Sequence, residues 1–314
     1  MKQSFQLIII LLFTLSLTNC GQNNDLKNLN PNSAPYKKLS VNQEDIEIQK
    51  MKELRVKSRK TYSKFSTKYI KGGGIEILVE RINLDENGNK SEQFRYLSNG
   101  DVDFQWLYNY DYYQRLTTTE SYDGFQTLLS KIINEYDGEG YKNKSEEWSE
   151  KSKTYTTSKY VYDKNYNLLE TSSSNERDGF LYKSEYKYTD SMLDSVLFLN
   201  NKNQLLTTIK IKYDSDKRKV GVSEFNSTGI SLETEYKYDS NSNLIEIKNN
   251  KLSSFSYKYD EKGNVIDEIE YNSGGYQQNR FGYEYDKSTG LLVKKIRYDG
   301  ENDPALLIRY EYEY

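Results

Sequence analysis

The sequence predicts an all-β fold, with about nine to ten β-hairpin repeats in one long antiparallel sheet, coiled into a spiral or barrel-like shell, after a short N-terminal helix. Three observations predict it. Aromatic and polar residues alternate, as in Tyr257-Lys258-Tyr259, so that the rings share one face of an extended chain. Turn-forming residues follow, as at Asp260 and Gly263-Asn264. The combination then recurs at near-constant intervals along the chain.

The interval is measured from the residue just before each turn, which recurs in steps of 25 to 27 residues with one step of 21. These residues are Leu84, Tyr110, Tyr136, Tyr162, Tyr188, Tyr213, Tyr238, Tyr259, Tyr285 and Tyr312. An Asp follows each of them except Tyr188, which precedes Thr189, and Tyr312, which precedes Glu313. A fixed period of this size is typical of repeat arrays, in which each unit buries its apolar face against its neighbours.

Residues 1–19 are predicted to be a lipoprotein signal peptide. The apolar run from Leu7 to Leu17 is too short to span a bilayer and has the length of a signal-peptide core. Leu17-Thr18-Asn19-Cys20 resembles a bacterial lipobox, which makes Cys20 the predicted lipid-attachment site. Cys20 is the one cysteine of the chain and cannot form an internal disulfide. The alternative is an ordinary secretory signal with an incidental thiol.

Two short segments are predicted between this signal and the repeats. Residues 20–40 contain Asn, Gln, Ser and two prolines, which favours a flexible tether. Residues 41–55 are predicted to form a short helix, with Ser40 as its N-cap, that covers the first free sheet edge. The repeat domain then extends over residues 56–314, and its first hairpin turns at Gly72-Gly73-Gly74.

The motif Tyr-x-Tyr-Asp-x-x-Gly-Asn resembles the YD repeat of the RHS family. The Tyr-x-Tyr-Asp half occurs at residues 108–111, 160–163, 236–239, 257–260 and 283–286. The Gly-Asn half is intact at Gly88-Asn89 and Gly263-Asn264. The resemblance implies a hollow β-sheet shell over roughly residues 56–314. The twist of so wide a sheet separately predicts that it coils with its aromatic face inward. Most units here are longer than the family's usual repeat.

Composition narrows the classes of function. The formal net charge is −3, and removal of Lys2 with the signal would make it −4, so no basic surface for nucleic acid is expected. The chain has no histidine, which removes the commonest general base and metal ligand. We therefore expect no catalytic residue, no cofactor and no metal site. The recurring aspartates are interpreted as turn residues, and Asp85-Glu86-Asn87-Gly88-Asn89 as a tight turn rather than a calcium loop.

These features favour a non-enzymatic protein that is held at the bacterial outer membrane or cell surface by its lipid anchor. Its repeat sheet would serve as a binding scaffold for a glycan or a protein. One alternative is a passive structural component of the envelope. The other is a polysaccharide hydrolase that uses two carboxylates, because Asp and Glu are plentiful. The 31 tyrosines are interpreted first as cross-strand packing and second as a surface that could stack on sugar rings.

Overall fold

The computed structural model describes residues 43–65 and 74–314, and within these ranges it contains one helix and a 20-stranded sheet. The helix is α2 (Gln43–Glu53). The strands are β1 (Ser58–Phe65), β2 (Ile77–Leu84), β3 (Lys90–Tyr96), β4 (Val102–Tyr110), β5 (Leu116–Asp123), β6 (Leu128–Tyr136), β7 (Lys142–Ser149), β8 (Thr154–Tyr162), β9 (Leu168–Asn175), β10 (Gly179–Thr189), β11 (Met192–Asn200), β12 (Leu205–Tyr213), β13 (Lys219–Asn226), β14 (Gly229–Tyr238), β15 (Leu244–Asn249), β16 (Ser254–Tyr259), β17 (Val265–Tyr271), β18 (Gln277–Tyr285), β19 (Leu292–Tyr298) and β20 (Pro304–Glu313).

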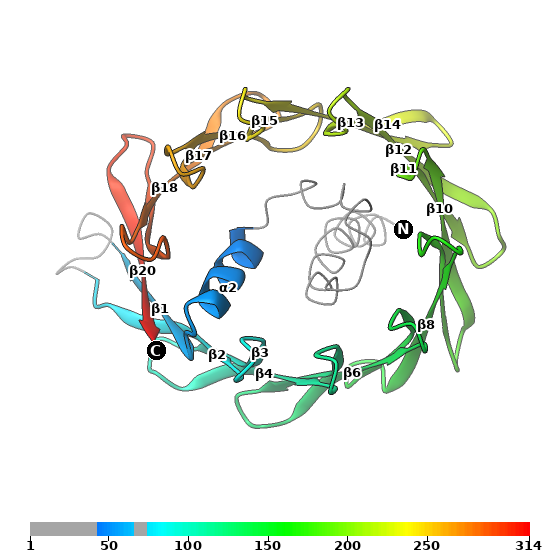
Figure 1. Ribbon diagram of the computed structural model, residues 1–314, viewed down its shortest axis with the longest axis horizontal. Coiled ribbons are helices and arrows are strands. Elements are labelled where there is room, and N and C mark those ends of the chain that lie inside the picture. The colour runs from blue at the N-terminus through cyan, green and yellow to red at the C-terminus, as the bar shows by residue number, and fades with distance from the viewer. Residues whose placement is uncertain (1–42, 66–73) are drawn as a thin grey trace.

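The sheet closes into a barrel, as Figure 1 shows. Each strand pairs antiparallel with the next along the chain, and β20 then pairs antiparallel with β1 from Ser58↔Glu313 to Phe65↔Leu306. The all-β hairpin array is therefore confirmed, whereas the spiral alternative is wrong. Pairing of the first and last strands removes both sheet edges, which would otherwise expose unpaired backbone groups.

Helix α2 lies inside the ring of strands (Figure 1). Met51 is fully buried and packs on Ile82 of β2, on Leu84 at its end and on Leu291. The face of the sheet that contacts α2 is called the inner wall below. Because side chains alternate along a strand, the tyrosines that share the orientation of Leu84 in the later repeats also face inward.

The helix is also held to the wall by polar contacts. The Glu47 carboxylate accepts hydrogen bonds from the Leu292 backbone N–H, at 3.1 Å, and from the Tyr312 hydroxyl. Lys50 Nζ donates to Asn264 Oδ1 at 3.0 Å and to the Gly290 carbonyl at 2.9 Å. Burial raises the pKa of Glu47.

The short helix is therefore found where it was predicted, but the role predicted for it is wrong. Strand β1 pairs with β2 on one side and with β20 on the other, so it has no free edge for the helix to cover. The helix instead packs against the inner wall. The predicted N-cap Ser40 and the Gly72-Gly73 part of the first turn lie outside the described residues.

The repeated aspartates form the turns between hairpins. At Asp260, the backbone N–H donates to the Asn264 carbonyl at 2.9 Å. Its Oδ1 atom accepts the N–H groups of Lys262, at 2.9 Å, and Asn264, at 2.8 Å. Gly263 has a positive φ of 81°, which glycine adopts without strain. The same side chain to backbone bonds recur at Asp111, Asp137, Asp163, Asp214 and Asp239. The predicted structural role of these residues is thus seen directly.

The repeat that lacks the aspartate has a different turn. Where Thr189 replaces Asp, β10 and β11 are joined by Asp190 and Ser191, with φ values of 51° and 63°. Two central residues with positive φ are typical of a two-residue type I′ hairpin. The exception in the sequence therefore corresponds to a shorter loop within the same sheet.

The last tyrosine of an even-numbered strand closes the open end of its hairpin. The Tyr285 hydroxyl of β18 donates to the Val265 carbonyl of β17 at 2.9 Å, beyond the last backbone pair of these strands, Asp267↔Gly282. Equivalent bonds, 2.6 to 3.0 Å long, are made in the described chain by Tyr136, Tyr162, Tyr213, Tyr238, Tyr259 and Tyr312. The period-two tyrosine therefore gives these seven hairpins a polar clasp as well as an apolar ring.

The tyrosine clasp can be tested with Tyr285→Phe, which removes the hydroxyl and keeps the ring. We expect a loss of about 1 kcal/mol in the free energy of unfolding, because the Val265 carbonyl loses its partner. Urea unfolding followed by circular dichroism measures this. Tyr314→Phe is the matched control, because that side chain is 59% exposed and its variant should unfold like the wild type. Equal stabilities of all three proteins would contradict the role of the clasp.

The turn carboxylates predict a pH dependence that can be tested at Asp286. Hydrogen bonds from Ser288 and Thr289 lower the pKa of Asp286 from 3.8 to about 2. A lowered pKa in the folded state gives stability that is present above the unfolded value and lost as the pH falls through about 2. Asp286→Asn keeps the acceptor oxygen without the charge. The difference in unfolding midpoint between wild type and variant should therefore shrink between about pH 4 and pH 2. A difference that stays constant over that interval would contradict the interpretation.

Candidate binding surface on the inner wall

Three aromatic rings gather at one end of the inner wall, where the turns after β6 and β8 lie side by side. The rings of Tyr141 and Tyr166 are stacked, with centroids 4.3 Å apart and planes at 8°. The Tyr162 ring lies 5.5 Å from that of Tyr141 and is tilted by 50°. Tyr166 is 47% exposed. These three residues, called the tyrosine patch below, present ring faces that are only partly covered by protein.

The stacking follows from a contact between successive turns. In each contact, the first residue stands four positions after the aspartate of one turn. The second residue stands three positions after the aspartate of the next Asp turn along the chain. Asn89 Nδ2 donates to Gln114 Oε1 at 2.7 Å in this way, and Arg218 Nη1 donates to Ser242 Oγ at 3.2 Å. At Tyr141 and Tyr166 both positions are aromatic, so a ring stack replaces the hydrogen bond.

Two cations flank the tyrosine patch. Lys142 Nζ lies 4.6 Å from the centroid of the Tyr160 ring. The Arg115 guanidinium lies 4.7 Å from the Tyr136 centroid and forms an ion pair with Asp111 at 2.7 Å. Arg115 is therefore compensated by a carboxylate. Burial lowers the pKa of Lys142.

A second lysine has the same environment further along the wall. Lys219 Nζ lies 4.3 Å from the Tyr236 centroid, and the Tyr238 hydroxyl donates to the Lys219 carbonyl at 2.8 Å. Burial lowers the pKa of Lys219 to about 8 and raises that of Tyr236 to about 12. The lysine and the tyrosine thus both have reduced tendencies to be charged, as expected away from bulk water.

The inner wall also carries carboxylates, and the best-defined ones are engaged. Glu268 accepts a hydrogen bond from the Tyr283 hydroxyl. Glu80 pairs with Arg59 at 2.8 Å and accepts from Gln93 Nε2 at 2.7 Å. Glu47, the acid whose pKa is raised, fastens α2 to the wall. These contacts are structural, and they give the hydrolase alternative no free acid and base pair at these residues.

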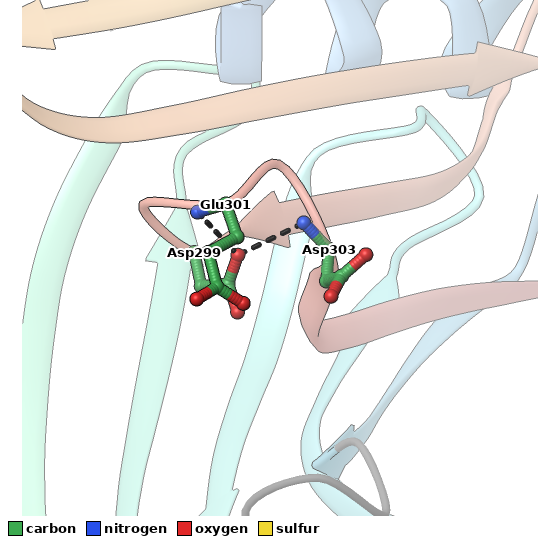
Figure 2. Close-up of side chains that lie close together, drawn as sticks. All are labelled: Asp299, Glu301 and Asp303. Atoms are coloured by element: carbon green, nitrogen blue, oxygen red, sulfur yellow. Dashed lines mark hydrogen bonds between the residues drawn. The ribbon is translucent and has the colours of Figure 1, made fainter.

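One group of carboxylates in the described chain lies close enough together to share a metal ion. Figure 2 shows Asp299, Glu301 and Asp303 in the turn after β19, with ligand atoms within 4.8 Å of one another. Asp299 Oδ1 accepts the N–H groups of Glu301 and Asp303, both at 2.9 Å, so the turn itself brings the three residues together. The sequence analysis did not single out this group, and the expectation of no metal site stays a prediction. The Asp-x-Glu-x-Asp spacing could have identified it.

The residues singled out from the sequence fall in different places. The predicted lipid-attachment residue Cys20, with the signal peptide and tether, lies outside the described residues. The Asp85 turn is a tight turn, with Asp85 Oδ1 accepting the N–H groups of Asn87 and Asn89 at 2.9 and 2.8 Å. The tyrosine patch was not singled out, although both of its turn positions can be read from the repeat alignment. Within the described ranges, no helix is both long and apolar enough to cross a membrane.

Comparison with known proteins gives structural similarities. No protein-family model and no curated protein sequence matches the chain. A crystal structure of TcdB2-TccC3-TEV is 11% identical, with a TM-score of 0.30 over 74% of this chain and 16% of that chain. The Photorhabdus luminescens Tc holotoxin pore is 11% identical, with a TM-score of 0.29 over 79% of this chain and 18% of that chain. A porin-like protein from Bacteroides uniformis is 10% identical, with a TM-score of 0.35 over 82% of this chain and 96% of that chain. This chain thus spans less than a fifth of each toxin chain.

Proposed function

We propose that this protein is a lipid-anchored component of the bacterial cell envelope whose inner barrel wall binds glycan chains without catalysing their cleavage. The observation that carries the proposal is the tyrosine patch. Stacked and partly exposed rings offer flat apolar faces, and their hydroxyls and the neighbouring Lys142 offer polar contacts. Sugar rings need this combination, because they have apolar faces and polar edges.

The width of the barrel supports a ligand on the inside. The interior of a β-barrel widens with the number of strands, and beyond about sixteen strands its own side chains no longer fill it. This barrel has 20 strands. A polymer chain could therefore run along the inner wall beside α2, in contact with tyrosines of several repeats.

The outer wall supports a barrel that stands in water rather than in lipid. Oppositely charged residues face each other directly on neighbouring strands, as in Lys144–Glu135 at 2.9 Å and Lys294–Glu284 at 2.9 Å. Lys131–Glu120 and Lys237–Glu246 are further pairs of this kind. A barrel wall in contact with lipid needs an apolar outer band instead. Attachment to the envelope would then depend on the predicted lipid at Cys20.

The binding function can be tested with glycan arrays and the chain from residue 21 onward. We expect binding to at least one envelope-type polysaccharide. Tyr166→Ala should raise its Kd by about tenfold, since the loss of one stacking ring removes roughly 1.4 kcal/mol. Tyr276→Ala is the matched control, because Tyr276 is also exposed, at 75%, but lies in the turn between β17 and β18, at the opposite rim. Its Kd should equal that of the wild type.

Negative results would redirect the proposal. A pull-down from envelope extracts that recovers one protein partner, together with no binding on the array, would favour the protein-scaffold reading. No ligand in either experiment would favour a passive structural component. Release of shortened sugars from a bound polysaccharide would contradict the absence of catalysis.

The anchor has a separate test in cells that are fed a labelled fatty acid. The label should enter the wild-type protein and should be absent from Cys20→Ala, because no other thiol is available. Cell fractionation of both proteins is the second measurement, and the variant should be recovered in the soluble fraction. Equal labelling of the two proteins would contradict lipidation at this residue.

A further inference from the structure

One inward position in each repeat separates the units into two classes. It is the first residue of the strand that follows each Asp turn, or its equivalent in the shorter turn after β10. In most repeats it is aliphatic: Leu116, Leu168, Leu193, Leu244, Val265 and Leu292. In three it is lysine: Lys90, Lys142 and Lys219. The fold therefore accepts an aliphatic side chain at this position, and lysine is not required to build the turn.

Lys142 and Lys219 lack a charge partner within the described part of the chain. The ammonium groups contact the Tyr160 and Tyr236 rings, and burial alone accounts for the lowered pKa of each lysine. The outer-wall lysines differ, since Lys144, for example, pairs with Glu135 and Glu146. The contact with a ring face compensates only part of the hydration free energy that a buried ammonium group loses.

The backbone of each lysine is fixed in the same way. The Tyr162 hydroxyl donates to the Lys142 carbonyl at 3.0 Å, and the Tyr238 hydroxyl donates to the Lys219 carbonyl at 2.8 Å. Each ammonium group thus lies on a clasped strand end, over the first ring of a Tyr-x-Tyr pair. Such a preorganised, partly dehydrated cation gains most from an anionic group that arrives with a ligand.

We propose that Lys142 and Lys219 are two equivalent subsites for the acidic groups of one anionic glycan. This inference rests on the proposed function and specifies its ligand class. The two subsites lie three hairpins apart, at the starts of β7 and β13. A chain with regularly spaced carboxylate or sulfate groups can engage both at once, while its sugar rings lie on the tyrosines. Two linked contacts of this kind give an affinity above that of either alone.

The test compares polymers that differ in charge. Dextran and dextran sulfate share a backbone, and polygalacturonate supplies carboxylates in place of sulfates. We expect tighter binding of either acidic polymer than of dextran, and a loss of that advantage as NaCl rises from about 0.05 M to about 0.5 M. Comparison of the two acidic polymers identifies which anionic group the lysines prefer.

The variants replace each lysine by the residue that other repeats use. Lys142→Leu and Lys219→Leu should each weaken binding of the acidic polymer by about tenfold, and the double variant by about a hundredfold, with a smaller effect on dextran binding. Lys202→Leu, which removes the same charge from an exposed turn, is the control and should bind like the wild type. If a leucine variant folds poorly, Lys142→Met and Lys219→Met, which have unbranched side chains, should show the same loss of affinity for the acidic polymer.

The outcomes separate this inference from the function on which it rests. Equal binding of acidic and neutral polymers, unchanged in the lysine variants, would overturn the anion subsites and leave glycan binding in place. An equal loss of affinity in Lys202→Leu would also overturn them, because net charge would then explain the effect. Absence of binding to every polymer would overturn both proposals.

Discussion

The hydrogen bond from a tyrosine hydroxyl to a strand-end carbonyl is the interaction on which the rest of the structure depends. Backbone pairing between β17 and β18 ends at Asp267↔Gly282, and the Tyr285 hydroxyl then reaches the Val265 carbonyl beyond it. A two-stranded hairpin is marginal on its own in water, so a repeat is stabilised by its neighbours and, in seven of the hairpins, by this clasp. The same ring also forms the inner wall. One residue type therefore supplies both the stability of the hairpin and the surface offered to a ligand.

Local chemistry made most of the fold predictable. Alternating rings and the Asp turns place the strands and reversals correctly, and Thr189 marks the repeat whose loop differs. Closure was not predictable, because it depends on pairing between β1 and β20, which are separated by the whole array. The position of α2 depends on closure as well. Met51 finds its apolar contacts only inside a completed ring, where Leu84 takes the place of the usual tyrosine.

The candidate site could be predicted only in part. The aromatic inner face follows from the two-residue alternation of aromatic and polar side chains. Which rings stay partly exposed depends instead on contacts between successive turns. These contacts are set by the stagger of neighbouring hairpins. Tyr141 and Tyr166 are 25 positions apart in the sequence and become a stacked pair only in that arrangement. The face on which each lysine lies was hard to predict for a similar reason. Lys142 and the outer-wall Lys144 stand two positions apart, and the bulge between Glu135 and Tyr136 puts them on opposite faces.

Closure of the ring through β1 and β20 also constrains how such a protein can change in size. The two seam strands run antiparallel, which requires an even number of strands around the ring. A single added strand would reverse the direction of one seam partner and leave the ladder unmatched. Growth or shrinkage is therefore restricted to whole hairpins. One repeat, which is 21 to 27 residues long in this chain, is then the increment by which the circumference can evolve.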